Sequence, residues 1–115
     1  MGILSRDEIL SNADKSIRVE PLEVKELGGT VYVREMLESE YQQVIAPHVG
    51  KESSNLAARF CVVCLSDTDG ERLFTNGDLS TLAAKLSHKT LEKIARKAIE
   101  VNAAGDETLE DFEGN

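Results

Sequence analysis

The chain is poor in aromatic residues and in cysteine and has no long apolar run, and each shortage excludes a class of protein. Of its 115 residues, 4% are aromatic and none is Trp. The core must therefore be built from aliphatic side chains. With 2 cysteines, the chain has neither the disulfide framework of a small secreted domain nor the ligands of an all-cysteine zinc site. No window approaches the ~18 consecutive apolar residues of a membrane span.

Basic residues are also scarce, which restricts the partners. Lys and Arg number 13 against 21 Asp and Glu, a net charge of −8. Such a surface repels phosphate backbones, so we expect no nucleic-acid partner. The opening MGILSRDEIL has Arg6 but no long apolar stretch, so it is not typical of a signal peptide. We therefore expect a cytoplasmic protein with no membrane contact, one domain in size.

The first third of the chain predicts an arm and a β-hairpin. Residues 1–15 are polar apart from Ile3, Leu4, Ile9 and Leu10. They predict an N-terminal arm, in which Ser5 is suited to capping one turn of helix. From Ile17 to Arg34 the apolar period becomes two, and Gly28-Gly29 divides the run, which predicts a hairpin. Pro21 places the first strand at a sheet edge or breaks it. A lone hairpin is marginally stable, so its apolar face must pack on the helices or on another subunit.

The rest of the chain has apolar residues spaced by three and four, which predicts helices. The first helix begins near Glu38 and ends before Pro47. Each of the other three follows a residue suited to capping a helix N-terminus: Asn55, Asp78 and Ser87. The stretch from Leu56 to Leu65 is apolar almost all round, so we expect a central helix.

These elements predict an α+β fold, with an N-terminal β-hairpin followed by about four helices, predominantly helical. Residues 16–105 form the expected single domain, and residues 106–115 an acidic C-terminal tail. The predicted core consists of aliphatic and aromatic side chains on the helices: Phe60, Val63, Leu82, Leu86, Leu91, Ile94 and Ile99.

The two cysteines form the pattern Cys61-x-x-Cys64, which is shared by metal and redox sites. The chain has no second Cys pair, and His48 and His88 are not at ligand spacing. The pair lies inside an apolar stretch rather than at a helix N-terminus, where a thiolate would be stabilised. We therefore predict packed core thiols that bind no metal and form no disulfide.

Other candidate chemistry is weaker. The acidic segment from Asp67 to Glu71 differs from a calcium loop, because Gly70 comes two places early and Asp78 stands where a Glu is needed. It is predicted to be a plain acidic turn. Neither histidine is joined to a nucleophile by any motif, so we expect no enzyme and no catalytic residue.

Two segments are candidates for contacts with other proteins. Val31 and Val33 in the hairpin are the expected subunit contact, because an edge strand offers unpaired backbone groups. The partner-binding candidates are Leu109 and Phe112 in the acidic tail, since a short linear segment docks its apolar side chains in a groove, or else the apolar face of the last helix. An alternative is an acidic interaction or inhibitor module, either a nucleic-acid mimic or an adaptor. Against the mimic, the acids are interleaved with bases along the last helix.

In their order, five segments give a family resemblance that covers residues 3 to 105. They are the arm Leu4–Leu10, the hairpin end Val31–Met36, the acidic helix Glu38–Tyr41, the turn Asp67–Phe74 and the helical region Asp78–Asn102. Together they resemble the tail assembly chaperones of long-tailed, siphovirus-type bacteriophages.

The resemblance implies a non-enzymatic protein without cofactor or metal. Such chaperones bind the long, helical tape measure protein, keep it soluble and bring major tail protein to it. The resemblance further implies a homo-oligomer in the host cell cytoplasm that is absent from the mature virion. Many members also have a longer product made by translational frameshift, and the acidic end of this chain fits the shorter product.

Overall fold

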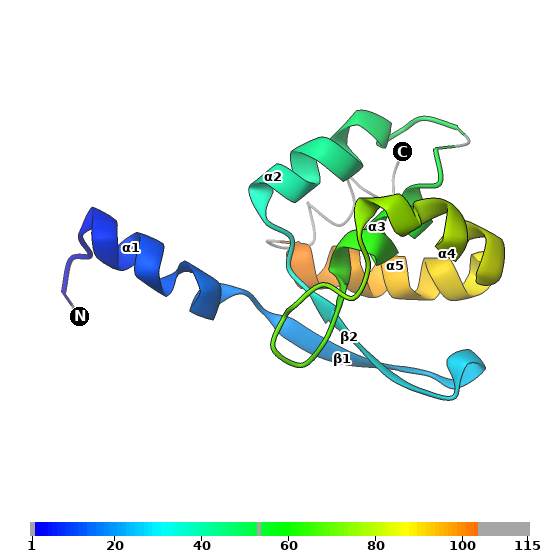
Figure 1. Cartoon of the computed structure of the whole chain (residues 1–115), viewed down its shortest axis with the longest axis horizontal. Helices are drawn as coiled ribbons and strands as arrows, with labels where there is room; N and C mark the ends of the chain where they lie inside the picture. The colour runs from blue at the N-terminus through cyan, green and yellow to red at the C-terminus, as the bar shows by residue number, and fades with distance from the viewer. Residues whose placement is uncertain (1, 53, 104–115) are drawn as a thin grey trace.

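A computed structural model describes residues 2–52 and 54–103 and confirms the α+β fold (Figure 1). The N-terminal part consists of α1 (Arg6–Asn12), a 3-10 turn (Ala13–Ser16), β1 (Val19–Val24), a second 3-10 turn (Lys25–Leu27) and β2 (Gly29–Arg34). The helical part consists of α2 (Glu38–Glu40), continued by a π-helical turn (Tyr41–Ile45) and a 3-10 turn (Ala46–His48), then α3 (Leu56–Cys64), β3 (Leu65–Ser66), a 3-10 turn (Asn76–Asp78), α4 (Leu79–Lys85) and α5 (His88–Asn102).

The sheet is antiparallel, with strand order β1-β2-β3. Pro21 lies in β1, opposite Tyr32, and β1 is an edge strand as predicted, where a missing N–H is tolerated. β3 is a strand that the sequence did not predict: Leu65, expected to end the central helix, instead pairs with Val33. β2 is consequently the middle strand, and the expectation that it is an edge is wrong along this stretch.

The hairpin packs on this chain's own helices. Val24 and Val33 have no exposed surface and belong to the core. On the outside, Lys97 of α5 lies 3.0 Å from Glu20 of β1, and Lys93 lies 3.5 Å from Glu26 in the hairpin loop. The helices therefore supply the support that a two-stranded hairpin lacks.

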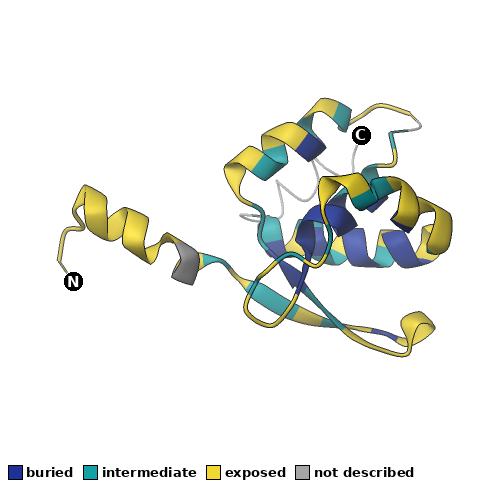
Figure 2. Cartoon of the chain, viewed as in Figure 1, coloured by how far each residue is buried: buried dark blue, intermediate teal, exposed yellow. Residues whose placement is uncertain are grey.

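Helix α3 is at the centre, as its apolar composition predicts. Five consecutive residues, from Phe60 to Cys64, are buried, which requires neighbours on every side of the helix; Figure 2 shows this dark centre against α5. The predicted core residues Phe60, Val63, Leu82, Leu91 and Ile94 are buried. Leu86 and Ile99 were wrongly assigned to it: both are half-buried and pack on its margin.

The predicted caps have mixed outcomes. Ser87 caps α5, since its Oγ accepts from the N–H of Thr90 at 3.1 Å. Asn55 precedes α3 but has a left-handed backbone (φ 56°) and makes no capping hydrogen bond with its side chain. Asp78 does not cap α4 either, because its carboxylate accepts from the N–H of Thr75 at 2.8 Å, one turn earlier. The prediction of a cap at Ser87 is confirmed, and the other two are wrong.

A buried polar joint connects the hairpin to the helices. Arg34, at the end of β2, is 3% exposed, and its Nη2 lies 2.6 Å from Oε2 of Glu40. Its Nε donates to the carbonyl of Val63 at 3.2 Å. Arg72 lies 3.7 Å from the same Glu40 oxygen and donates to the carbonyl of Val62 at 3.1 Å. These carbonyls belong to the last turn of α3, which lacks helical donors.

Asn102 connects the end of α5 to the same region. Its Oδ1 accepts from the N–H of Met36 at 2.7 Å, and its Nδ2 donates to the carbonyl of Ala98 at 2.8 Å and that of Arg34 at 3.4 Å. One amide side chain thus ends α5 and fixes the segment that leads from β2 to α2.

We predict that Ile94→Ala destabilises the protein by about 2–5 kcal/mol, because Ile94 is fully buried and the substitution leaves a cavity. The matched control is Ile99→Ala on the same helix, which removes a half-buried side chain and should cost clearly less. Urea unfolding followed by circular dichroism measures both. Equal losses would contradict the burial of the two positions.

We also predict that Arg34→Met costs about 3 kcal/mol, because it leaves Glu40 and the carbonyl of Val63 without their buried donor. The control is Arg18→Met in the segment leading into β1, which removes the exposed ion pair of Arg18 with Glu20 and should cost less than about 1 kcal/mol. The difference in urea midpoint between the two variants is the measurement. If Arg18→Met lowered the urea midpoint as much as Arg34→Met does, the buried joint would contribute no more to stability than an exposed ion pair.

Candidate protein-interaction surface

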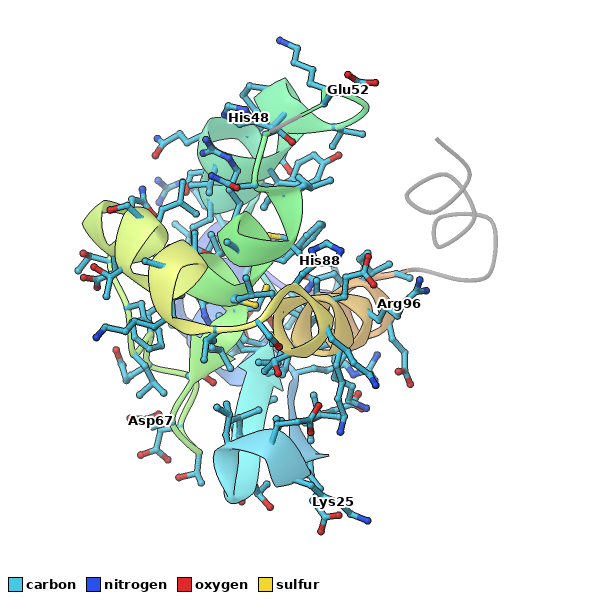
Figure 3. The ribbon with its side chains drawn as sticks, turned by 90° about the vertical axis from the view of Figure 1, so that its right-hand side faces the viewer. Lys25, His48, Glu52, Asp67, His88 and Arg96 are labelled. Atoms are coloured by element: carbon cyan, nitrogen blue, oxygen red, sulfur yellow. The ribbon has the colours of Figure 1, made fainter. Side chains whose placement is uncertain are left out.

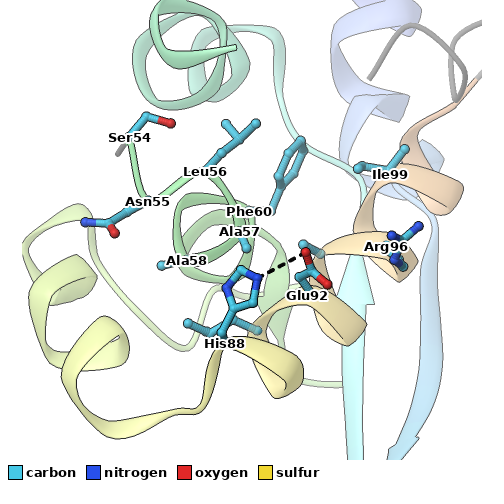
Figure 4. Close-up of a pocket in the computed structure, with 12 residues that line it drawn as sticks. Ser54, Asn55, Leu56, Ala57, Ala58, Phe60, His88, Glu92, Arg96 and Ile99 are labelled. Carbon is cyan, nitrogen blue, oxygen red and sulfur yellow. Dashed lines mark ion pairs between the residues drawn. The ribbon is translucent and has the colours of Figure 1, made fainter. Parts of the chain in front are cut away.

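A groove of about 490 Å³ lies between α3 and α5 (Figure 4). Its lining includes apolar side chains from both helices: Leu56, Ala57, Phe60, Leu91, Ala95 and Ile99. His88 and Glu92 lie beside it with their side chains 3.2 Å apart. This pair is exposed and contributes little to stability. An apolar channel between two helices is the kind of surface that accepts an amphipathic helix.

The described residues contain no assembled catalytic or metal centre. In residues 2–52 and 54–103, no group of three or more His, Cys, Asp or Glu side chains is placed to hold a metal ion. His48 follows α2, whereas His88 begins α5, and the two lie in different parts of the molecule (Figure 3). Asp67 is occupied by its own turn, since its carboxylate accepts from the N–H groups of Asp69 and Glu71. No helix in the described part has the length and apolar character to cross a bilayer.

The residues predicted to contact a second subunit or a partner differ in how far the structure leaves them exposed. Val33 is fully buried opposite Leu65, so its side chain has no surface to offer a second subunit unless the sheet opens. Val31 is half-buried and lies beyond the part of β2 that β3 covers, and its role stays a prediction. Leu109 and Phe112 lie outside the described residues.

The groove is a surface feature that the sequence did not predict. Ile99 was assigned to the core and Leu56 to a central helix, so no groove was expected between them. The four aliphatic residues that stand out in the polar arm are all exposed: Ile3, Leu4, Ile9 and Leu10. Leu4 before the cap and Ile9 after it have the spacing of a hydrophobic staple.

Cys61 and Cys64 are core residues, as predicted. Both thiols are free and fully buried. Burial raises the pKa of each from the ordinary 9.0 to about 12, so neither thiol is a thiolate at neutral pH. A metal site or a reactive thiol needs the thiolate. That they bind no metal stays a prediction.

We predict that these thiols make the protein less stable as the pH rises from about 9 to about 12. Above pH 9 they ionise in the unfolded chain but not in the folded one, so the unfolded state gains by up to about 1.4 kcal/mol per pH unit for each thiol. Urea unfolding at several pH values measures this slope. The variant Cys61→Ala plus Cys64→Ala should be less stable at pH 8 but have a shallower slope. An equal slope in both proteins would contradict the burial of the thiols.

Comparison with known proteins gives a likeness in structure. No family model matches the chain, and no curated protein matches its sequence. Among solved structures, the chain is similar to the bacteriophage HK97 tail assembly chaperone, with a TM-score of 0.62 over 79% of this chain and 86% of that one. The identity is 18%, so the likeness is one of fold. The resemblance inferred from the sequence is confirmed at that level: this chain has the fold of a bacteriophage tail assembly chaperone.

Proposed function

We propose that this chain is a non-enzymatic tail assembly chaperone of a long-tailed, siphovirus-type bacteriophage. The observation that carries the proposal is the likeness to the HK97 chaperone over 79% of the chain, which a family resemblance in the sequence had anticipated. In this role the protein binds the tape measure protein, keeps it soluble and helps to recruit major tail protein. It acts in the host cell cytoplasm as a homo-oligomer and is absent from the mature virion.

The surface supports a role in protein contacts. Besides the groove, large apolar side chains are exposed on the arm, the hairpin loop and two other loops: Ile3, Leu4, Ile9, Leu10, Leu27, Leu37 and Leu73. Single exposed apolar residues are ordinary, but a cluster on one segment is typical of an interaction site. The buried Arg34 and the half-buried Glu40 connect structural elements rather than face a cavity. This pattern favours binding over catalysis.

The acidic-mimic alternative gains no support from the described surface. A nucleic-acid mimic needs uninterrupted rows of carboxylates. Here Glu20 and Glu26 lie against Lys97 and Lys93, so bases interrupt the acidic positions. We therefore retain the chaperone as the proposal.

The direct test is coexpression with the tape measure protein of the same phage. We expect that protein to be insoluble alone and soluble beside this chain, and to be retained with it on an affinity column. Leu109→Glu plus Phe112→Glu should reduce the soluble amount several-fold, because charge opposes burial in a groove. Thr108→Glu plus Gly114→Glu is the control, since it adds the same charge at non-apolar tail positions.

The experiment tests the chaperone role and the role of the two tail residues separately. If the tape measure protein stays insoluble beside the unaltered chain, the chaperone proposal is wrong. If the unaltered chain works and the Leu109 and Phe112 variant works equally well, the proposed partner-binding residues are wrong and the chaperone proposal stands.

A further inference from the structure

The sheet has a long outer edge, which is formed by β1. This strand has 6 residues and, within the described part of the chain, pairs with β2 on one side only; Figure 1 shows it at the outer border of the sheet. Two of its residues, Pro21 and Glu23, are exposed. An exposed edge presents unpaired backbone groups to which a strand of another chain can add. The outer side of β1 is therefore the place where strand addition to this protein has to be considered.

The backbone of Pro21 faces this outer side. The N–H of Glu35 donates to the carbonyl of Arg18 at 2.9 Å, so Arg18 and Glu35 are a hydrogen-bonded pair. Along an antiparallel ladder, hydrogen-bonded pairs alternate with non-hydrogen-bonded pairs. Pro21 lies three positions beyond Arg18, opposite Tyr32. The pair of Pro21 with Tyr32 is therefore non-hydrogen-bonded, and the backbone nitrogen of residue 21 points away from β2.

The pairing on the other side of β2 agrees with this orientation. The N–H of Leu73 donates to the carbonyl of Leu65 at 3.0 Å, so the backbone of Leu65 faces away from β2. The next residue, Ser66, faces toward β2, where its partner is Tyr32. Tyr32 thus directs its backbone groups toward β3 and not toward Pro21. Two independent hydrogen bonds give the same orientation for residue 21.

Proline at this position costs the hairpin nothing and removes a donor from its outer side. The outward-facing residues are Val19, Pro21 and Glu23, because they alternate with the residues that bond to β2. Val19 and Glu23 each present an N–H, whereas Pro21 between them has none, and its ring occupies the place of the hydrogen. An added strand would meet the ring there, and its own carbonyl would be buried without a donor.

We propose that Pro21 closes the outer edge of the sheet, so that a second copy of this chain cannot add its β1 strand to this one. The block acts through the backbone and is specific to outward-facing positions of β1. A proline at an inward-facing position would remove a ladder bond of the hairpin itself. The same residue type at the neighbouring position would therefore damage the fold instead of protecting it.

This inference goes beyond the proposed function and does not depend on it. The sequence predicted that a strand edge is the subunit contact, and the edge that the structure leaves open is β1. With that edge closed, copies of the chain meet through side-chain surfaces and not through a shared sheet. Closing an exposed edge in this way is a common protection against edge-to-edge aggregation.

The variant Pro21→Thr tests the block, because threonine restores the N–H and favours strands. It adds no large apolar surface, so new association would come from the backbone. Amide hydrogen exchange, followed by NMR at low and high protein concentration, measures pairing at the outward-facing amides of Val19 and Glu23. In Pro21→Thr their exchange should slow roughly 10-fold or more as the concentration rises, because each gains a hydrogen bond. In the unaltered chain it should not depend on concentration.

The matched control moves the proline along the strand. Pro21→Thr plus Glu23→Pro places the block at another outward-facing position, so this double variant should behave like the unaltered chain. Leu22→Pro, by contrast, removes the inward-facing N–H that bonds to Val31, and it should lower the urea midpoint. Circular dichroism checks that each variant is folded. Pro21→Val restores the same N–H with another strand-forming residue and should give the same result as Pro21→Thr.

Two results would overturn the proposal. If exchange at Val19 and Glu23 is equally fast at both concentrations in folded Pro21→Thr and Pro21→Val, Pro21 is not what closes the edge. If exchange at these amides slows with concentration in the unaltered chain, the edge accepts a strand in spite of Pro21. The solubility of the coexpressed tape measure protein tests the proposed function independently, since neither result depends on that partner.

Discussion

Removing a guanidinium from water costs several kcal/mol unless its donors find acceptors, and this constraint acts on Arg34, which is 3% exposed. Its acceptors come from two elements: the carboxylate of Glu40, at the end of α2, and the carbonyl of Val63, at the end of α3. Arg72 approaches the same carboxylate from the loop after β3. The hairpin, α2 and α3 must therefore meet in one arrangement for any of these groups to be satisfied.

The same joint explains how α3 can end inside the core. The last carbonyls of a helix have no helical donors and are normally solvated. Here the chain passes from Cys64 directly into β3, where water is excluded, and the two arginines supply the donors. Asn102 extends the joint to α5 through Met36 and Arg34. Charged side chains thus replace water at a point where four elements converge.

The well-packed core of the protein differs in exposure from the apolar surfaces around it. The core consists of α3, the inner face of α5 and the covered part of the hairpin. The arm, by contrast, is a capped helix with exposed aliphatic side chains, and the α3–α5 groove exposes part of the core's margin. A well-packed body lets such apolar surfaces remain exposed without unfolding.

The sequence by itself determined the class of the long segments: the hairpin and the helices. The period of two around Gly28, the spacing of three and four after Glu38, the Ser87 cap and the edge position of Pro21 are local signals, and each was realised. Tertiary structure alone decided that Leu65 joins β2 as a third strand, that Val33 is covered, and that Ile99 faces a groove. The physical reason is that a sequence pattern states which side chains are apolar, whereas the packing partner determines which of them are covered.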